Sequence, residues 1–169
     1  MKKNLALTGM MGVGKSTVGI ALSKRLLTGF SDIDKIIENK LKMSVKKIFE
    51  KKGEAYFRKI EEKITLEEFK KSNTVISLGG GAFVNPVIRK AALSRCKSFW
   101  LDLNLKLLVK RLAKSKKRPL LVDKNLKETL EKIYKERKIT YSSADFRINC
   151  SNLNINLITN KIIKLYANN

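Results

Sequence analysis

The chain contains no histidine, so metal sites and general bases built on an imidazole are excluded. Its two cysteines, Cys96 and Cys150, lie far apart and lack the spacing of a metal site, so we expect free thiols in a reducing compartment. No stretch approaches the about 18 apolar residues that a membrane span needs. Residues 1–4 lead directly into an apolar run and leave no room for a signal peptide. We therefore expect a cytoplasmic protein with no membrane partner.

Acidic residues are also few: 15 Asp and Glu stand against 37 Lys and Arg, which gives a formal net charge of +22. A basic nucleic-acid-binding module is one interpretation of this excess. The basic residues are spread along the chain, however, and many lysines fall on predicted solvent faces of helices. We therefore expect a solvated basic surface and no nucleic-acid partner. Such a surface would attract an anionic small-molecule substrate.

Apolar strand-like runs alternate with helical patterns along a chain whose length predicts a single domain, residues 1–169. The expected strands are residues 4–8, 30–31, 74–78, 98–101 and 146–149. The expected helices are residues 15–27, 34–41, 45–51, 54–71, 86–94, 105–113, 126–142 and 156–167. This alternation predicts an α/β fold, a three-layer sandwich with helices on both faces of a parallel sheet. Ligands should bind beyond the carboxyl ends of its strands.

Residues 9–16 match G-x-x-x-x-G-K-[ST], the phosphate-binding P-loop. An apolar run precedes the motif and an amphipathic helix follows it, which is the context that a P-loop requires. Backbone N–H groups of the loop and the positive end of the helix would face a phosphate. Lys15 would add a mobile charge for the β- and γ-phosphates, and the Ser16 hydroxyl would ligate Mg²⁺. We therefore expect ATP and Mg²⁺ as cofactors, with the nucleotide held by Gly12, Val13, Gly14, Lys15, Ser16 and Thr17.

Two further groups of residues follow predicted strands. Asp32 and Asp34 come after the second strand, on the P-loop side of the sheet. One carboxylate could orient Mg²⁺ through water, and the other could accept a proton from an alcohol. The alternative is structural, with Asp34 as a helix cap and Asp32 in a turn. Gly79, Gly80 and Gly81 follow the third strand, and they either leave open backbone for a ligand or form an ordinary flexible connection.

Arginines are scarce, eight against 29 lysines, so their positions are informative. Arg58 lies at the start of a long helix and Arg137 near the end of another. Each could hold a carboxylate through two parallel hydrogen bonds, or be a surface residue. The polar segment 114–125 could be a lid, or a loose basic loop. Arg118 in this segment, seven residues after Arg111, could stabilise charge on a transferring phosphoryl group.

These elements occur in one order along the chain: the P-loop, Asp32-x-Asp34, Gly53-Glu54-x-x-Phe57-Arg58-x-x-Glu61, Gly79-Gly80-Gly81, Arg118-Pro119-Leu120-Leu121 and Glu136-Arg137-x-x-x-Tyr141. The combination resembles shikimate kinase over nearly the whole chain. The resemblance implies a fold like that of the nucleoside monophosphate kinases, with a five-stranded parallel sheet. It also implies transfer of the ATP γ-phosphate to the 3-hydroxyl of shikimate, in aromatic amino-acid biosynthesis. Small P-loop kinases that act on gluconate or a nucleoside monophosphate remain the alternative.

The resemblance further implies a role for each candidate residue on the substrate side. Asp34 would contact a shikimate hydroxyl, and Asp32 would contact the water shell of Mg²⁺. Arg58 and Arg137 would bind the shikimate carboxylate. The backbone of Gly79, Gly80 and Gly81 would line the same pocket.

The catalytic residues implied by the resemblance are Lys15, Asp34 and Arg118, while Arg111 would flank the adenine. We expect the enzyme to be a monomer. One departure from the family lies before the two aspartates, where Gly29 weakens the second strand and leaves its start open.

Overall fold

The computed structural model of the chain describes residues 3–113 and 126–168. Its centre is a five-stranded sheet in which all paired strands run parallel, in the order β2-β3-β1-β4-β5. The strands are β1 (Asn4–Thr8), β2 (Gly29–Asp32), β3 (Thr74–Ser77), β4 (Cys96–Asp102) and β5 (Phe146–Asn149). The α/β fold and the five-stranded parallel sheet expected from the sequence are confirmed.

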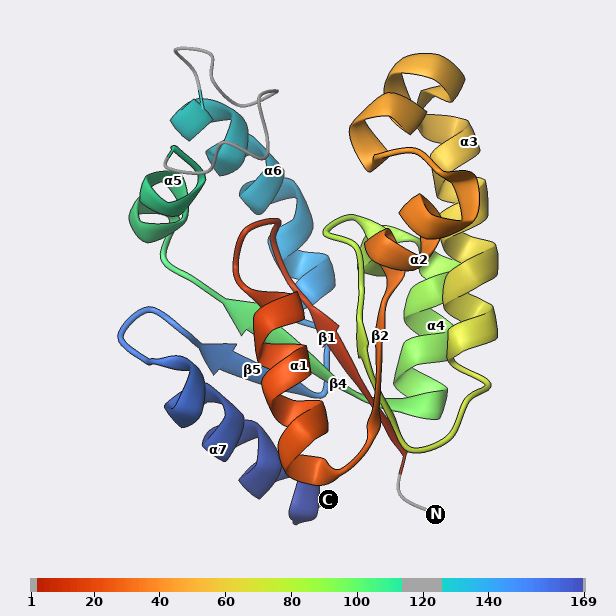
Figure 1. Cartoon of the computed structure of the whole chain (residues 1–169). Helices are drawn as coiled ribbons and strands as arrows, with labels where there is room; N and C mark the ends of the chain where they lie inside the picture. Colours follow the sequence, from red (N-terminus) through yellow and green to blue (C-terminus); the bar gives the residue numbers. More distant parts are fainter. Residues whose placement is uncertain (1–2, 114–125, 169) are drawn as a thin grey trace.

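Helices cover both faces of this sheet (Figure 1). Helices α1 (Lys15–Leu26) and α7 (Ile155–Ala167) lie in front of it in this view, and α4 (Pro86–Arg95) and α6 (Leu126–Tyr141) lie behind it. The remaining helical elements are α2 (Ile33–Leu41), α3 (Val45–Glu68), the short 3₁₀ helix η1 (Ala82–Val84) and α5 (Leu105–Ala113). Because all paired strands run parallel, their carboxyl ends lie together at one end of the sheet. A ligand site is expected there.

The core lies on both sides of the central strand. Every residue of β1 is buried, and its register pairs Leu5 with Val75 of β3 and Leu7 with Phe99 of β4.

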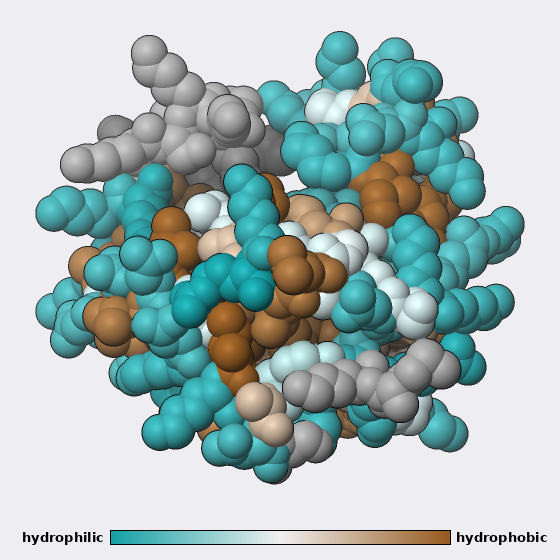
Figure 2. Space-filling view, turned by 60° about the horizontal axis from the view of Figure 1, so that its bottom comes forward, coloured by the Kyte–Doolittle hydropathy of each residue, from teal (hydrophilic) through white to brown (hydrophobic). Residues whose placement is uncertain are grey.

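Among the described residues Lys15 is the only buried lysine. Figure 2 shows hydrophilic residues over most of the face it presents, with apolar patches between them. These observations agree with the solvated basic surface expected from the sequence.

Two local features place the candidate site residues. The sequence predicts separate helices at 45–51 and 54–71, and the structure joins them into α3 across Gly53, whose φ of 80° and ψ of 166° are not helical. A positive φ favours glycine, so Gly53 provides the kink from which the second half of α3 starts. Strand β2 begins at Gly29, which settles the start that the sequence left open. The α3 kink sets the direction of the segment that carries Arg58 and Glu61.

The cap of α2 corrects one structural alternative. Asp32, not Asp34, is the N-cap residue, and its side chain accepts a hydrogen bond from the backbone N–H of Lys35 at 3.2 Å. The interpretation of Asp34 as the helix cap is therefore wrong. Asp34 lies in the first turn of α2.

Within the described part of the chain, no helix combines the length and the apolar character that crossing a membrane requires.

Candidate active site

The P-loop joins the end of β1 to the start of α1. Gly14 is the N-cap residue of α1, with a φ of 103°, and as a glycine it offers no side chain to cap the first turn of the helix. The first backbone N–H groups of α1 therefore lack a side-chain cap and lie at the positive end of the helix. That arrangement can bind a phosphate anion.

Lys15 places a buried ammonium group inside this loop. Its Nζ donates hydrogen bonds to the carbonyl oxygens of Gly9, at 2.8 Å, and Met10, at 3.0 Å. Both acceptors lie in the loop, so the charge is held where the backbone turns from strand to helix. A cation at this place can stabilise negative charge on a bound polyphosphate.

Ser16 and Asp32 converge beside the loop from two different elements. The Ser16 hydroxyl, in the first turn of α1, donates a hydrogen bond to the carboxylate of Asp32 at the end of β2. A hydroxyl and a carboxylate are the oxygen ligands that Mg²⁺ prefers, alone or through water. The donor set present here therefore fits that ion.

The glycine turn after β3 forms the opposite wall of the site. A Cβ atom on Gly79 would lie 2.3 Å from Oε1 of Glu61 and 2.9 Å from Oδ1 of Asp34. A Cβ atom on Gly81 would lie 2.6 Å from Nη2 of Arg58. Both carboxylates and the guanidinium group thus pack directly against backbone that only glycine leaves open. The turn brings together charged groups from α2 and α3.

Arg58 and Glu61 form the most buried ion pair of this wall. Nη1 of Arg58 lies 2.6 Å from Oε2 of Glu61, whose side chain is 1% exposed, and Nη2 lies 3.1 Å from Oε1 of Glu54. Burial raises the pKa of Glu61 above its usual range, against the opposing effect of Arg58, and Asp34 raises it further. Oε1 of Glu61 has no hydrogen-bond partner among the described residues. A buried acceptor without a donor is costly, and a ligand donor or water could satisfy it.

Arg137 reaches the same turn from helix α6. Its Nη1 donates to the carbonyl oxygen of Gly80 at 3.0 Å, and the hydroxyl of Tyr141 donates to that same oxygen. On the side facing the P-loop, a Cβ atom on Gly80 would lie 3.2 Å from the backbone nitrogen of Met11. The glycine turn is therefore in contact with the P-loop on one side and with α6 on the other.

Of the remaining predicted residues, Arg111 and Thr17 are described by the structure and Arg118 is not. Arg111 is exposed on α5, and its Nη1 donates to the carbonyl oxygen of Val13 in the P-loop at 3.3 Å. Thr17 is exposed in the first turn of α1. Arg118 and the rest of the predicted lid at 114–125 lie outside the described residues. The structure thus brings Asp32, Asp34, Arg58, Arg111 and Arg137 to the carboxyl edge of the sheet.

Two residues of this wall received no role from the sequence. Glu61 and Tyr141 occur in the motifs given above, but neither was assigned a role there. Glu61 follows Arg58 by three residues on α3, and Tyr141 follows Arg137 by four on α6. Charged or polar pairs at these helical spacings share one face. That spacing is the signal from which their role could have been inferred.

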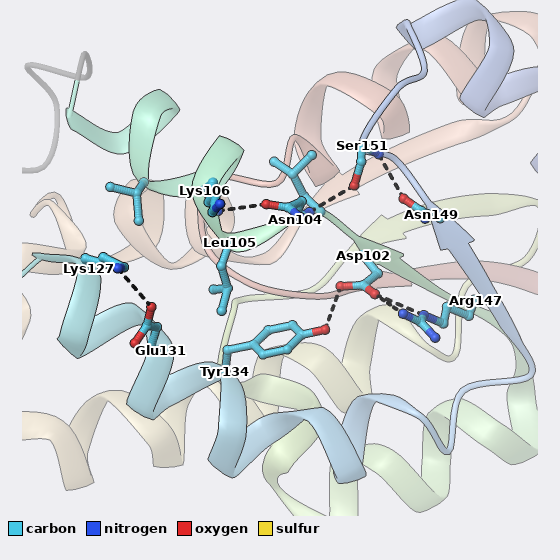
Figure 3. A pocket seen from close by; sticks show the side chains of 12 residues that line it. Asp102, Asn104, Leu105, Lys106, Lys127, Glu131, Tyr134, Arg147, Asn149 and Ser151 are labelled. Atoms are coloured by element: carbon cyan, nitrogen blue, oxygen red, sulfur yellow. Dashed lines mark hydrogen bonds and ion pairs between the residues drawn. The ribbon is translucent and has the colours of Figure 1, made fainter.

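A separate cavity of about 690 Å³ lies between β4, β5, α5 and α6 (Figure 3). Leu105 and Val109 of α5 line it, whereas Leu108 and Leu112 of the same helix face Gly12 of the P-loop. The cavity therefore lies on another side of α5 from the phosphate loop. None of the candidate site residues that the structure describes lines it.

Asp102 and Arg147 form an ion pair inside that cavity. Asp102 at the end of β4 accepts two hydrogen bonds from Arg147, at 2.6 and 2.9 Å, and one from the hydroxyl of Tyr134 at 3.1 Å. Figure 3 shows these three side chains pointing toward one another. Their contacts tie β4 to β5 and to α6, which is a structural role.

Comparison with known proteins gives a consistent result. A protein-family model described as shikimate kinase matches residues 11–167. The chain is 36% identical to the shikimate kinase of Thermoanaerobacter pseudethanolicus over 168 residues, which covers 97% of this chain and 96% of that relative. It is 37% identical to the shikimate kinase of Bacillus subtilis over 167 residues, 96% of this chain and 88% of that one. Among solved structures, shikimate kinase from Acinetobacter baumannii in complex with shikimate matches with a TM-score of 0.94 and 31% identity, over 99% of this chain and 94% of that one.

Proposed function

The chain belongs to the shikimate kinase family, and we propose that it transfers the γ-phosphate of ATP to the 3-hydroxyl of shikimate, giving shikimate 3-phosphate and ADP. The observation that carries this proposal is the contact between the P-loop, which holds Lys15, and the glycine turn after β3. Gly80, on the wall with Asp34 and the two arginines, lies against Met11 of the P-loop. A phosphoryl donor and a hydroxy-acid acceptor held by these walls would be neighbours.

On the donor side, the loop backbone and Lys15 bind the polyphosphate of ATP. Lys15 moves from the carbonyl oxygens of Gly9 and Met10 to the phosphate oxygens and stabilises charge as the γ-phosphate is transferred. Ser16 and Asp32 would hold Mg²⁺, whose charge offsets that of the phosphates when it is bound. Arg111, which already contacts the P-loop at Val13, flanks the adenine.

On the acceptor side, Arg58 of α3 and Arg137 of α6 bind the shikimate carboxylate. A guanidinium group offers two parallel N–H donors to a carboxylate, and both arginines lie at the glycine turn. Asp34 accepts a hydrogen bond from the 3-hydroxyl, orients it toward the γ-phosphate and takes up its proton. The backbone of Gly79, Gly80 and Gly81 forms the floor beneath the ring.

Catalysis then rests on positioning and electrostatics, because phosphoryl transfer requires little covalent chemistry from the protein. The hydroxyl attacks in line, and Lys15 stabilises the negative charge on the equatorial oxygens. Arg118 is proposed to add a second positive charge to the transferring group. We further propose that the enzyme works as a cytoplasmic monomer, without a nucleic-acid or membrane partner.

A coupled assay of ADP release tests the proposal directly. The protein is supplied with ATP and Mg²⁺ and a panel of acceptors: shikimate, gluconate, CMP and AMP. We expect release with shikimate only, and its loss when EDTA removes Mg²⁺. Release with another acceptor, and none with shikimate above the ATP-only background, would overturn the proposed function.

A further inference from the structure

Tyr141 is the last residue of α6 and is fully buried, yet its hydroxyl is directed at the candidate site. Its ring lies 5.9 Å from that of Trp100, centroid to centroid, in a tilted arrangement. The hydroxyl donates a hydrogen bond to the carbonyl oxygen of Gly80, which is 61 residues away in sequence, and lies 4.0 Å from the sulfur of Met10. One buried hydroxyl therefore touches both the glycine turn and the residue that precedes Met11 in the P-loop.

The carbonyl of Gly80 has a second donor on the same helix. Arg137 lies one turn before Tyr141, and its Nη1 donates to this oxygen at 3.0 Å. A carbonyl oxygen has two lone pairs, so the two side chains together satisfy it. Burial raises the pKa of Tyr141, which keeps its hydroxyl protonated and able to donate. The carbonyl of Gly80 is thereby fixed, and the guanidinium group of Arg137 is fixed against it.

We propose that Tyr141 is a positioning residue for the acceptor: through the carbonyl of Gly80 it holds the guanidinium group of Arg137 and keeps the glycine turn against the P-loop. The kinetic part of this proposal rests on the proposed function, since Arg137 is there a ligand of the shikimate carboxylate. The structural part concerns the order of one guanidinium group and needs no substrate. Tyr141 itself touches neither substrate nor nucleotide in this scheme.

The Tyr141→Phe variant removes only the hydroxyl and leaves the buried ring against Trp100. Losing one neutral hydrogen bond to the turn should raise KM for shikimate about three- to tenfold, with KM for ATP changed less than about twofold. Combining it with Arg137→Lys should give less than the product of the two separate effects, because both act on one contact. A role confined to folding would lower the denaturation midpoint without this split between the two KM values.

Tyr134→Phe is the matched control. Tyr134 lies on the same helix, seven residues earlier, and its hydroxyl donates at 3.1 Å to Asp102 rather than to the turn. Its loss should reduce stability and leave both KM values as in the wild type. Equal KM effects of the two variants would mean that α6 acts only as a packed helix, and would overturn the proposal.

Mobility of the Arg137 side chain in the ligand-free protein separates this inference from the proposed function. We expect the NMR order parameter of its Nε–H group to fall in Tyr141→Phe and to stay unchanged in Tyr134→Phe. If no acceptor supports turnover but the order parameter falls as expected, the substrate assignment is wrong while the positioning contact stands. An order parameter that Tyr141→Phe leaves unchanged overturns the inference, whatever the acceptor is.

Discussion

Replacing Gly81 by alanine gives a sharp test of the acceptor wall. The new Cβ atom would lie 2.6 Å from Nη2, 2.8 Å from Nη1 and 2.9 Å from Cζ of Arg58. Ordinary contact begins at 3.4 Å, so Nη2 must move by about 0.8 Å, the difference between 3.4 and 2.6 Å. The Arg58 side chain is 30% exposed and flexible at its end, so it can move at little cost to the fold.

The displacement should therefore affect binding more than stability. A misplacement of about 1 Å at a reacting site can cost about 100-fold, and one charge-assisted hydrogen bond contributes about 1.5–3 kcal/mol. We expect Gly81→Ala to raise KM for shikimate about 10- to 100-fold and to change KM for ATP less than about twofold. Steady-state kinetics in both substrates measure this, together with a urea denaturation curve.

Gly29→Ala is the control for this experiment. A Cβ atom there would lie 3.2 Å from the Thr74 hydroxyl, at the edge of the sheet and away from the glycine turn. This variant should keep the wild-type KM for shikimate. If Gly81→Ala folds and also keeps it, Arg58 does not hold the acceptor and the arrangement of the acceptor wall proposed above is wrong.

Four further outcomes are expected. Lys15→Met should lower kcat by about 100-fold or more in a folded protein, because it removes charge stabilisation at the phosphates; near-normal turnover would refute its role. Asp34→Asn should lower turnover about 10²- to 10⁴-fold, whereas Asp32→Asn should mainly shift the Mg²⁺ dependence, and swapped phenotypes would reverse these assignments. Arg137→Lys should weaken shikimate binding about 10- to 100-fold but weaken a neutral amide analogue less, and equal penalties would exclude a carboxylate contact. Burial raises the pKa of Glu61 above its ordinary 4.5, so the folded state binds this proton more tightly than the unfolded state does. The resulting contribution to the free energy of unfolding is complete below pH 4.5 and is lost as the pH rises through the pKa of the folded state. Urea denaturation should therefore show the wild type gaining stability relative to Glu61→Gln as the pH falls from neutral, and a constant difference would contradict the shift.

Local signals in the sequence predicted most of the fold. The apolar run at residues 4–8, the P-loop and the helix after it form one strand-loop-helix unit, and each part supports the same arrangement. The sequence predicts two helices with a break between residues 51 and 54, and the structure places a positive φ at Gly53 within that break. Strand β2 was harder to bound, because Gly29 has low strand propensity and pairing with β3 decides its start.

Contacts between distant residues could not be predicted in the same way. The bond from Tyr141 to Gly80 spans 61 residues and depends on how α6 packs over the sheet. The raised pKa of Glu61 results from its burial. The sequence alone does not show that this charged residue lies on the buried face of α3. The cap of α2 depends on a choice between Asp32 and Asp34, two residues apart, which helix-end signals do not resolve.

The central claim is that phosphate passes from ATP to one hydroxyl group of shikimate. Two-dimensional ³¹P–¹H NMR of the reaction mixture tests it most directly, because it identifies the carbon that carries the new phosphate ester. We predict one product, with phosphorus coupled to the proton at C3 and formed in equal amount to ADP. Phosphorus at another position, or free phosphate with unchanged shikimate, would contradict the account.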